Sequence, residues 1–254
     1  MPLLANPTPA TTTPTAAYLV SLADRAEEVH AAQRLRYRVF GEEHGAALQV
    51  TPDGRDVDEF DALMDHLIVT DTSTGDVVGT YRLLPPGRSV HRYSDTEFDL
   101  QGLPADVRSA MVEAGRACVH PDHRSGAVIN LMWAGLARYV LRSGHRYLAG
   151  CASVSLTAGD RAAANAWQLA STRHAPPPEM RVRPHDPWTP TAPVEGEPSY
   201  AELPPLLRSY LRVGAWVCGA PCHDRDFGDA DFFVLLDTER MNDRYRRYFL
   251  NGCG

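Results

Sequence analysis

A single carboxylate stands in a mostly apolar stretch near the middle of the chain. Glu113 belongs to residues 112–119 (VEAGRACV), whose composition predicts a strand largely hidden from water. Burial disfavours the charged form of a carboxyl group, so we expect a raised pKa for Glu113 and a base that works near neutral pH. The simpler interpretation is a salt bridge between Glu113 and Arg116. For this pair taken alone, the simpler interpretation is the better one.

A turn and the start of a predicted helix follow this strand. Arg124, Ser125 and Gly126 lie just before apolar residues at helical spacing. The first N–H groups of a helix have no partner within the helix, and they attract phosphate groups. The sequence therefore predicts a phosphate site directly after a strand that carries a candidate base.

Three more segments precede this strand, and they weaken the salt-bridge interpretation. They are residues 36–40 (RYRVF), 58–61 (DEFD) and 79–84 (GTYRLL). In order and spacing they resemble the acyl-homoserine-lactone synthases, which belong to the GNAT acyltransferase superfamily. The resemblance implies an active site lined by Arg36, Phe40, Asp58, Asp61, Arg82, Glu113 and Arg116.

The whole sequence is closer still to the bacterial ornithine-lipid N-acyltransferases, often labelled hemolysin-like. Residues 65–69 (DHLIV), 150–153 (GCAS), 204–212 (PPLLRSYLR) and 224–237 carry this likeness, which spans residues 18–250. It implies an α/β fold of the GNAT type, with a mixed, mainly antiparallel central sheet flanked by helices. It also implies a single acyltransferase domain over residues 18–254.

The resemblance implies an acyltransferase that moves a (3-hydroxy)acyl chain from a phosphopantetheine thioester to the α-amine of ornithine or a similar amino acid. No tightly bound cofactor is expected. Glu113 would be the base, directly or through water, with Arg116 beside it as a second catalytic residue. A strand N–H near Cys118 or Val119 would stabilise the thioester oxygen as it becomes negative.

The identity of the acyl carrier is left open between acyl carrier protein and CoA. The usual pyrophosphate signature of the superfamily is Gln or Arg, two residues, Gly, one residue, then Gly or Ala. Residues 123–128 (HRSGAV) depart from it at both ends. This favours a donor with one phosphate, an acyl carrier protein. Arg138 and Arg142, four apart on one predicted helix, are candidates to contact such an acidic partner, although a solvated helix face explains them equally simply.

Two roles remain open for the charged residues near the N-terminus. Asp58 and Asp61 would alternate with Arg36, Arg82 and Arg116 in a charge network. The network would either orient the amino-acid substrate or hold the N-terminal segment over the site. By resemblance alone, Asp224 and Asp231 are candidate acceptor-binding residues. The Trp that lactone synthases carry soon after Phe40 is missing, which favours amino-acid N-acylation.

Composition excludes several other classes of function. The net charge is −7 over 254 residues, whereas a general nucleic-acid binder needs a basic surface. The Lys and Arg total of 25 is all Arg. Cys218, Cys222 and His223 lack a second pair at ligand spacing, so no metal site is predicted. The five Cys are expected to be reduced thiols.

Residues 1–17 show neither a basic start nor a sustained apolar core, so we expect a disordered tail rather than a secretory signal. With no apolar run long enough to span a bilayer, a cytoplasmic protein is predicted. Residues 241–250 mix cations and aromatics, so peripheral contact with the inner membrane face is a second expectation.

Periodicity predicts strands over residues 18–23, 66–70, 77–84, 112–119, 147–156 and 232–236. It predicts helices over 25–43, 130–143, 158–171, 206–213 and 241–250. Residues 173–203 contain many prolines, which excludes helix and central strand and favours a long surface excursion.

Two rivals to the main function stay open. One is a CoA-dependent N-acyltransferase or a signal synthase of the acyl-homoserine-lactone type. The other is a module that binds acyl carriers or lipids without turnover.

Overall fold

The computed structural model of the chain describes residues 18–124, 126–192, 194 and 196–241. Its strands are β1 (Tyr18–Leu22), β2 (Asp65–Asp71), β3 (Val77–Leu84), β4 (Phe98–Asp99), β5 (Met111–Val119), β6 (Tyr147–Ser155), β7 (Arg183–Pro184), β8 (Trp216–Val217), β9 (Cys222–Asp224) and β10 (Asp229–Asp237). Its α-helices are α1 (Ala26–Arg36), α2 (Ser94–Glu97), α3 (Ala105–Ala110), α4 (Ala127–Arg142), α5 (Arg161–Arg173) and α6 (Pro205–Arg212). A π-helical segment, η1 (Tyr37–Glu43), continues α1, so the predicted helix over residues 25–43 is confirmed in extent.

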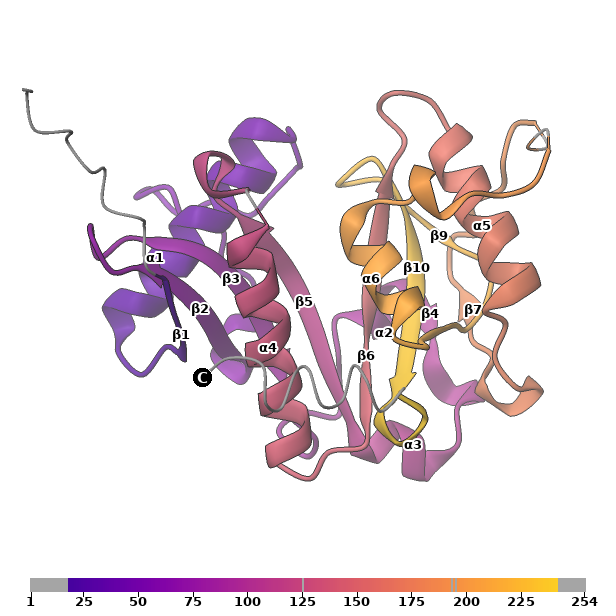
Figure 1. Cartoon of the computed structure of the whole chain (residues 1–254), viewed down its shortest axis with the longest axis horizontal. Coiled ribbons are helices and arrows are strands. Elements are labelled where there is room, and N and C mark those ends of the chain that lie inside the picture. The colour runs from indigo at the N-terminus through magenta and orange to yellow at the C-terminus, as the bar shows by residue number, and fades with distance from the viewer. Residues whose placement is uncertain (1–17, 125, 193, 195, 242–254) are drawn as a thin grey trace, which may run out of the picture.

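The central sheet has the strand order β1-β2-β3-β5-β6-β10-β8, and β9 pairs with one end of β10. All of these pairings are antiparallel except that between β5 and β6. The predicted α/β fold with a mixed, mainly antiparallel sheet is therefore confirmed (Figure 1).

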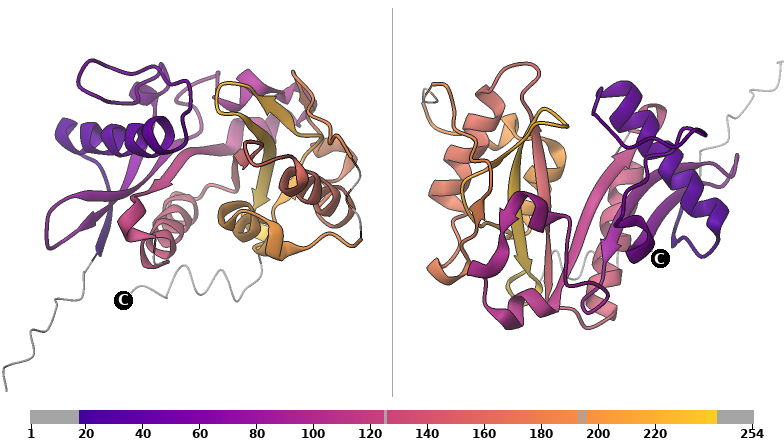
Figure 2. Two further views of the ribbon diagram at one scale, coloured as in Figure 1. Left: turned by 90° about the horizontal axis from the view of Figure 1, so that it is seen from above. Right: turned by 180° about the vertical axis from the view of Figure 1, so that it is seen from behind.

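Helices cover both faces of the sheet. Seen from above, α1 lies over the N-terminal strands and α4 lies beneath them (Figure 2). The strands explain this, because both faces of their pleat are apolar. In β10, Phe232, Val234 and Leu236 join the large core with α4, α5 and α6, whereas Phe233 and Leu235 join a second core with Phe98. We call the face that carries Phe233 and Leu235 the α2 face, because α2 and the segment after it cover it.

The strands β5 and β6 separate shortly after they meet. They pair only from Met111↔Tyr147 to Glu113↔Ala149, and beyond that point they diverge (Figures 1 and 2). At the last point of contact, a Cβ on Gly150 would collide with the carbonyl oxygen of Ala114. Only a residue without a side chain fits there, so Gly150 sets how closely the two strands approach before they part.

A β-bulge follows in β5. Two residues, Arg116 and Ala117, stand opposite the single Tyr81 of β3, because the register shifts between Thr80↔Cys118 and Arg82↔Gly115. Arg116 has a φ of 52°, which places a non-glycine residue in the left-handed region. The bulge re-aims the Arg116 side chain relative to a regular strand.

Arg36 anchors the N-terminal helix and the following loop to the sheet. Its side chain is fully buried. Its Nε donates to Asp56 Oδ2 at 2.8 Å, and its Nη2 donates to Asp61 Oδ2 at 2.9 Å. Because Asp56 and Asp61 belong to the loop between η1 and β2, one guanidinium holds that loop in place.

The proline-rich segment packs against the sheet edge near β8 and β9. Val182 N–H donates to the Cys218 carbonyl at 2.7 Å, and Trp188 N–H donates to the Pro221 carbonyl at 2.9 Å. Both side chains are buried. Among the described helices, none has the length and apolarity needed to cross a membrane.

We predict that Arg36→Met lowers the free energy of unfolding by about 3–5 kcal/mol, because it removes the shortest ion pairs of two buried carboxylates, Asp56 and Asp61. Burial raises the pKa of Asp61, but the charges of Arg36 and Arg82 outweigh burial and hold that pKa below its ordinary value. The stabilisation is therefore complete at neutral pH and is lost as the pH falls through the lowered pKa. Urea denaturation at several pH values measures both effects. The exposed pair of Arg25 with Glu28 supplies the control, and Arg25→Met should change stability little.

We also predict that Gly150→Val destabilises the protein by about 1–3 kcal/mol, because the new side chain forces β5 and β6 apart. The matched control is Gly115→Ala on the neighbouring strand, where an added Cβ meets no atom within 4 Å. Equal unfolding temperatures for the two variants would contradict the role assigned to Gly150.

Candidate active site

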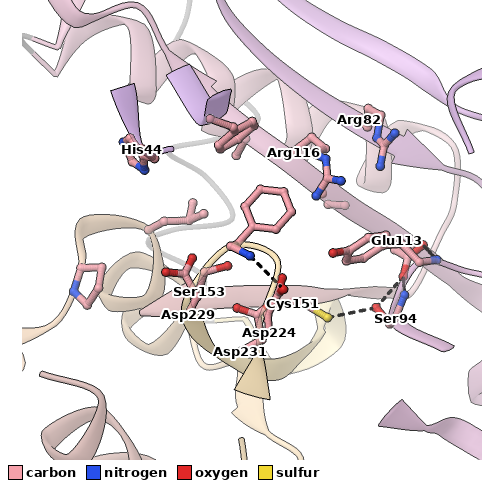
Figure 3. Close-up of a pocket in the computed structure, with 18 of the residues that line it drawn as sticks. His44, Arg82, Ser94, Glu113, Arg116, Cys151, Ser153, Asp224, Asp229 and Asp231 are labelled. Atoms are coloured by element: carbon pink, nitrogen blue, oxygen red, sulfur yellow. Dashed lines mark hydrogen bonds between the residues drawn. The ribbon is translucent and has the colours of Figure 1, made fainter. Parts of the chain in front are cut away.

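A cavity of about 340 Å³ opens where β5 and β6 diverge (Figure 3). Residues from both separated strands and from their neighbours line it. Its polar and aromatic lining consists of Phe40, His44, Arg82, Tyr93, Ser94, Glu113, Arg116, Cys151, Ser153, Ser155, Asp224, Phe227, Asp229 and Asp231.

Strand alternation explains why these side chains meet. Ala149 and Phe233 point to the α2 face. Successive side chains alternate between the faces of a sheet, so the residues two and four positions after Ala149, and two and four positions before Phe233, point there as well. These are Cys151 and Ser153 on β6, and Asp231 and Asp229 on β10. The apolar core of the α2 face thus gives way to polar residues at the end of the sheet where the strands part.

Glu113 lies at the last residue pair before the divergence and faces the short helix α2. Its carboxylate accepts hydrogen bonds from Tyr93 N–H at 3.0 Å, from Ser94 N–H at 2.8 Å and from the Ser94 hydroxyl at 2.5 Å. The Cys151 thiol donates in turn to Ser94 Oγ at 3.5 Å. Burial raises the pKa of Glu113, although the hydrogen bonds from Ser94 and Tyr93 oppose that shift. The expectation of a buried carboxyl at the edge of a cleft is met.

Arg116 faces the same cavity between two aromatic rings. Its guanidinium carbon lies 5.0 Å from the centroid of Tyr93 and 4.6 Å from that of Phe227. Its ion pairs with Asp56 and Asp58 are long, at 3.6 Å each. Arg116 does not pair with Glu113 among the ion pairs of the described residues, so the simple salt-bridge interpretation is wrong.

The charge network lies behind the cavity wall. Arg82 Nη1 donates to Asp58 Oδ1 at 2.6 Å and to Asp61 Oδ2 at 3.2 Å, and Arg36 joins from the other side. Phe40, Arg82 and Arg116 line the cavity, whereas Arg36, Asp58 and Asp61 do not. The network thus holds the N-terminal segment and presents only Arg82 and Arg116 to the cavity.

The opposite wall is acidic. Asp224, Asp229 and Asp231 lie together on β9 and β10, across the cavity from Arg82 and Arg116 (Figure 3). Burial, followed by repulsion from Asp231 and Asp224, raises the pKa of Asp229 to about 7. The cavity therefore has one cationic and one acidic side.

The candidate donor residues lie along the free edge of β5 and at the start of α4. His120 N–H donates to the Val78 carbonyl at 2.8 Å, so ladder alternation turns the N–H of the preceding Val119 away from β3 and toward the gap. The Cys118 side chain instead packs with Leu35 and Val39. Gly126 caps α4 at a φ of 95°.

Arg124 and Ser125 are the other two candidate residues for binding the donor phosphate. Arg124 is engaged by Glu43, with its two Nη atoms at 2.6 and 2.7 Å from the carboxylate oxygens. A phosphate would have to compete with that carboxylate. Ser125 lies outside the described residues, as does nearly all of the predicted helix over residues 241–250.

Arg138 and Arg142, the predicted carrier-protein contacts, lie toward the C-terminal end of α4, away from Gly126. The helix has 16 residues from Ala127 to Arg142, so Arg142 stands about 24 Å from the end that Gly126 caps. A contact that guides a phosphopantetheine arm into the gap should lie near that capped end. Arg38, exposed on η1 and near enough to influence His120, lies closer to it.

Sequence reasoning missed several residues of the site and its surroundings, among them Asp56, Ser94, Glu97 and Asp229. Asp56 and Asp229 had a detectable signal, because each stands two residues from an acid that was recognised. Ser94 and Glu97 have the spacing of a helix-capping pair, yet Ser94 binds Glu113 of a distant strand instead. No local pattern reveals such a contact.

Comparison with known proteins agrees with the fold. Residues 35–134 match the family model described as an acetyltransferase (GNAT) domain, a range that includes Glu113 and Arg116. The solved structure of BjaI, a CoA-dependent acyl-homoserine lactone synthase, superposes with a TM-score of 0.55 at 18% identity. That match covers 93% of this chain and 89% of BjaI, and it shows a shared fold.

Two characterised relatives are closer in sequence. The L-ornithine N(alpha)-acyltransferase of Rhodobacter capsulatus is 36% identical over 248 residues, covering 91% of this chain and 94% of that protein. The enzyme of the same name from Brucella abortus is 34% identical over 249 residues, covering 91% of this chain and 88% of that protein. With similarity of this degree along nearly the full length of both proteins, the chain belongs to the family of the L-ornithine N(alpha)-acyltransferases.

Proposed function

We propose that this acyltransferase moves a (3-hydroxy)acyl chain from an acyl carrier protein to the α-amine of ornithine or a similar amino acid. The observation that carries the proposal is the convergence of Glu113, Arg116 and an acidic wall on one cavity at the strand divergence. The names of the two relatives support ornithine as the acceptor.

The cationic side of the cavity suits the carboxylate of an amino acid. Arg116 makes only long ion pairs, and its Nε lacks a hydrogen-bond partner among the described residues. A substrate carboxylate would supply the missing acceptor. Arg82 would add a second positive charge, since it lines the same wall.

Glu113 is our candidate base. Its carboxylate accepts the Ser94 hydroxyl at 2.5 Å, and both residues line the cavity. A proton from the acceptor amine would reach Glu113 directly or by way of that hydroxyl. The amine nitrogen would attack the thioester carbon, so a C–N bond forms, the C–S bond breaks, and the leaving pantetheine sulfur takes up a proton to become a free thiol.

The free edge of β5 suits the pantetheine arm. Extended chains add to exposed sheet edges through backbone hydrogen bonds. The N–H of Val119 would stabilise the negative charge that develops on the thioester oxygen, and Cys118 would contribute only its backbone. The start of α4, with Arg124, Ser125 and Gly126, would receive the phosphate. Peripheral membrane contact through residues 241–250 would ease release of a lipidic product.

We predict that Glu113→Gln lowers kcat/KM for acyl transfer about 100-fold or more, because the amide accepts no proton. Activity of the unmodified enzyme should fall as the pH drops through the raised pKa of Glu113, and the variant should lose that dependence. Mass spectrometry of the N-acyl product, with release of free thiol, measures the rate. Glu179→Gln on the exposed surface is the control. Full activity in Glu113→Gln would remove this residue from the chemistry, and no turnover with any thioester would favour a non-catalytic binding module.

We predict that acyl carrier protein thioesters are used at least about tenfold more efficiently than the matching CoA thioesters. Arg38→Glu should raise KM for the carrier-protein donor about tenfold and leave KM for the CoA donor unchanged. The reason is that a carrier protein has a surface that extends beyond the cleft to Arg38, whereas CoA does not. Arg142→Glu, at the far end of α4, is the control with the same charge change. Preference for CoA, or equal effects of the two substitutions, would point to the CoA-dependent alternative.

A further inference from the structure

Four carboxyl groups gather on the acidic side of the cavity. They belong to Glu97 at the end of α2, Asp224 on β9, and Asp229 and Asp231 on β10. Among the ion pairs of the described residues, none joins any of the four to Arg or His. This separates them from Asp56, Asp58 and Asp61, each of which has an Arg partner.

Two of these carboxylates are buried with unfilled hydrogen-bonding capacity. Asp231 is 2% exposed and lines the cavity, and its Oδ1 has no hydrogen-bond partner among the described residues. Glu97 is 7% exposed, and both of its carboxylate oxygens also lack one there. Native proteins rarely leave buried polar atoms unmatched, because each such atom forfeits its hydration. A cationic donor at this point would supply hydrogen bonds to these carboxylate oxygens.

The sheet itself brings like charges together at this point. Asp224 and Asp229 are direct cross-strand partners in the β9–β10 pair. Two negative charges directly opposite each other destabilise a sheet. Asp224 Oδ1 accepts hydrogen bonds from the N–H groups of Asp226 and Phe227 in the turn between these strands. A bound cation would reduce the repulsion between Asp224 and Asp229.

The groups that face this wall come from several elements. His44 from the end of η1 approaches Asp229, and Cys151, Ser153 and Ser155 approach from β6. Burial raises the pKa values of both Glu97 and Asp231. Repulsion by Asp224 adds to the rise at both groups, and repulsion by Glu97 adds to it at Asp231, whereas interactions with Cys151 and Asp231 oppose it at Glu97. A cation beside these carboxyl groups would oppose the rise and favour their charged forms.

We propose that this acidic wall binds the side-chain ammonium of a diamino acid and so selects an acceptor with a second amine. The inference rests on the proposed function and extends it to the choice of substrate. Glu97 and Asp231 are the specificity-determining residues, with Asp224 and Asp229 adding negative charge. An acceptor would span the cavity, with its carboxylate at Arg116, its α-amine near Ser94 and Glu113, and its side chain at Asp231.

An ammonium fits better than a metal ion. Glu97, Cys151 and Asp231 do place one candidate ligand atom each within 4.8 Å of one another. However, burial raises the pKa of the Cys151 thiol, and a metal binds the thiolate. The thiol already donates to Ser94.

The test compares ornithine with norleucine, in which a methyl group replaces the ammonium. The purified full-length enzyme should prefer ornithine by about 100-fold or more in kcat/KM, because norleucine leaves the buried carboxylates unpaired. Asp231→Asn should lower kcat/KM for ornithine at least about 30-fold and leave that for norleucine within about threefold. Glu97→Gln should act in the same direction and serves as the second variant if Asp231→Asn does not fold. Glu197→Gln, at a side chain that is 91% exposed, should change neither substrate.

Stability gives an independent readout. Removing a repelling charge should keep or raise the unfolding temperature of Asp231→Asn while selectivity falls, as at sites held for function rather than stability. A merely structural Asp231 would lower the unfolding temperature and slow both acceptors alike.

Each other outcome overturns the inference. If the unmodified enzyme acylates ornithine and norleucine equally well, the proposed function stands and the acidic wall has no role in selection. If Asp231→Asn slows both acceptors equally, the residue serves the chemistry common to both. If EDTA abolishes both reactions and Mn²⁺ or Zn²⁺ restores them, the wall holds a metal. If no amino acid is acylated, the proposed function itself fails.

Discussion

The early parting of β5 and β6 is the constraint on which the rest of the molecule depends. The two strands share only three residue pairs, from Met111↔Tyr147 to Glu113↔Ala149, within a sheet that is otherwise well paired. Because the strands diverge, a cavity forms inside the sheet rather than on its surface. The same divergence frees one backbone edge of β5 and leaves Glu113 where the packed core ends. The candidate base, the free strand edge and the cavity thus arise from a single feature of the topology.

Positively and negatively charged residues of the cavity lie on different strands. Arg82 and Arg116 come from β3 and β5, whereas Asp224, Asp229 and Asp231 come from β9 and β10. The positive side is held by neighbours behind it, with Asp58 and Asp61 2.6 and 3.2 Å from Arg82. The negative side has no such support among the described residues. Ion pairs therefore tie the cationic wall into the fold, whereas none among the described residues does so for the acidic wall.

Much of this fold follows from sequence, and the reason is the length of its elements. The strands from Tyr18 to Asp237 that are five residues or longer carry enough apolar alternation to be predicted, as do α1, α4, α5 and α6. Short elements such as α2 and β9 do not, because they are stabilised by distant contacts. Glu113 was found because a charge in an apolar strand is conspicuous. Ser94 and Glu97 were not, because their roles exist only once α2 meets β5 and β10. The role expected of Arg142 stays a prediction, and the length of α4 places this residue far from the end that Gly126 caps.

The left-handed backbone of Arg116 limits which substitutions at this position would stabilise the protein without altering the cavity. A left-handed conformation suits glycine, and an arginine there costs on the order of 1–2 kcal/mol. The easiest route to a more robust protein at this position is thus a glycine, which would also delete the guanidinium between Tyr93 and Phe227. At this one residue, relief of backbone strain conflicts with keeping a guanidinium in the cavity. Engineering for durability should therefore leave this position alone and seek its gains elsewhere in the sheet.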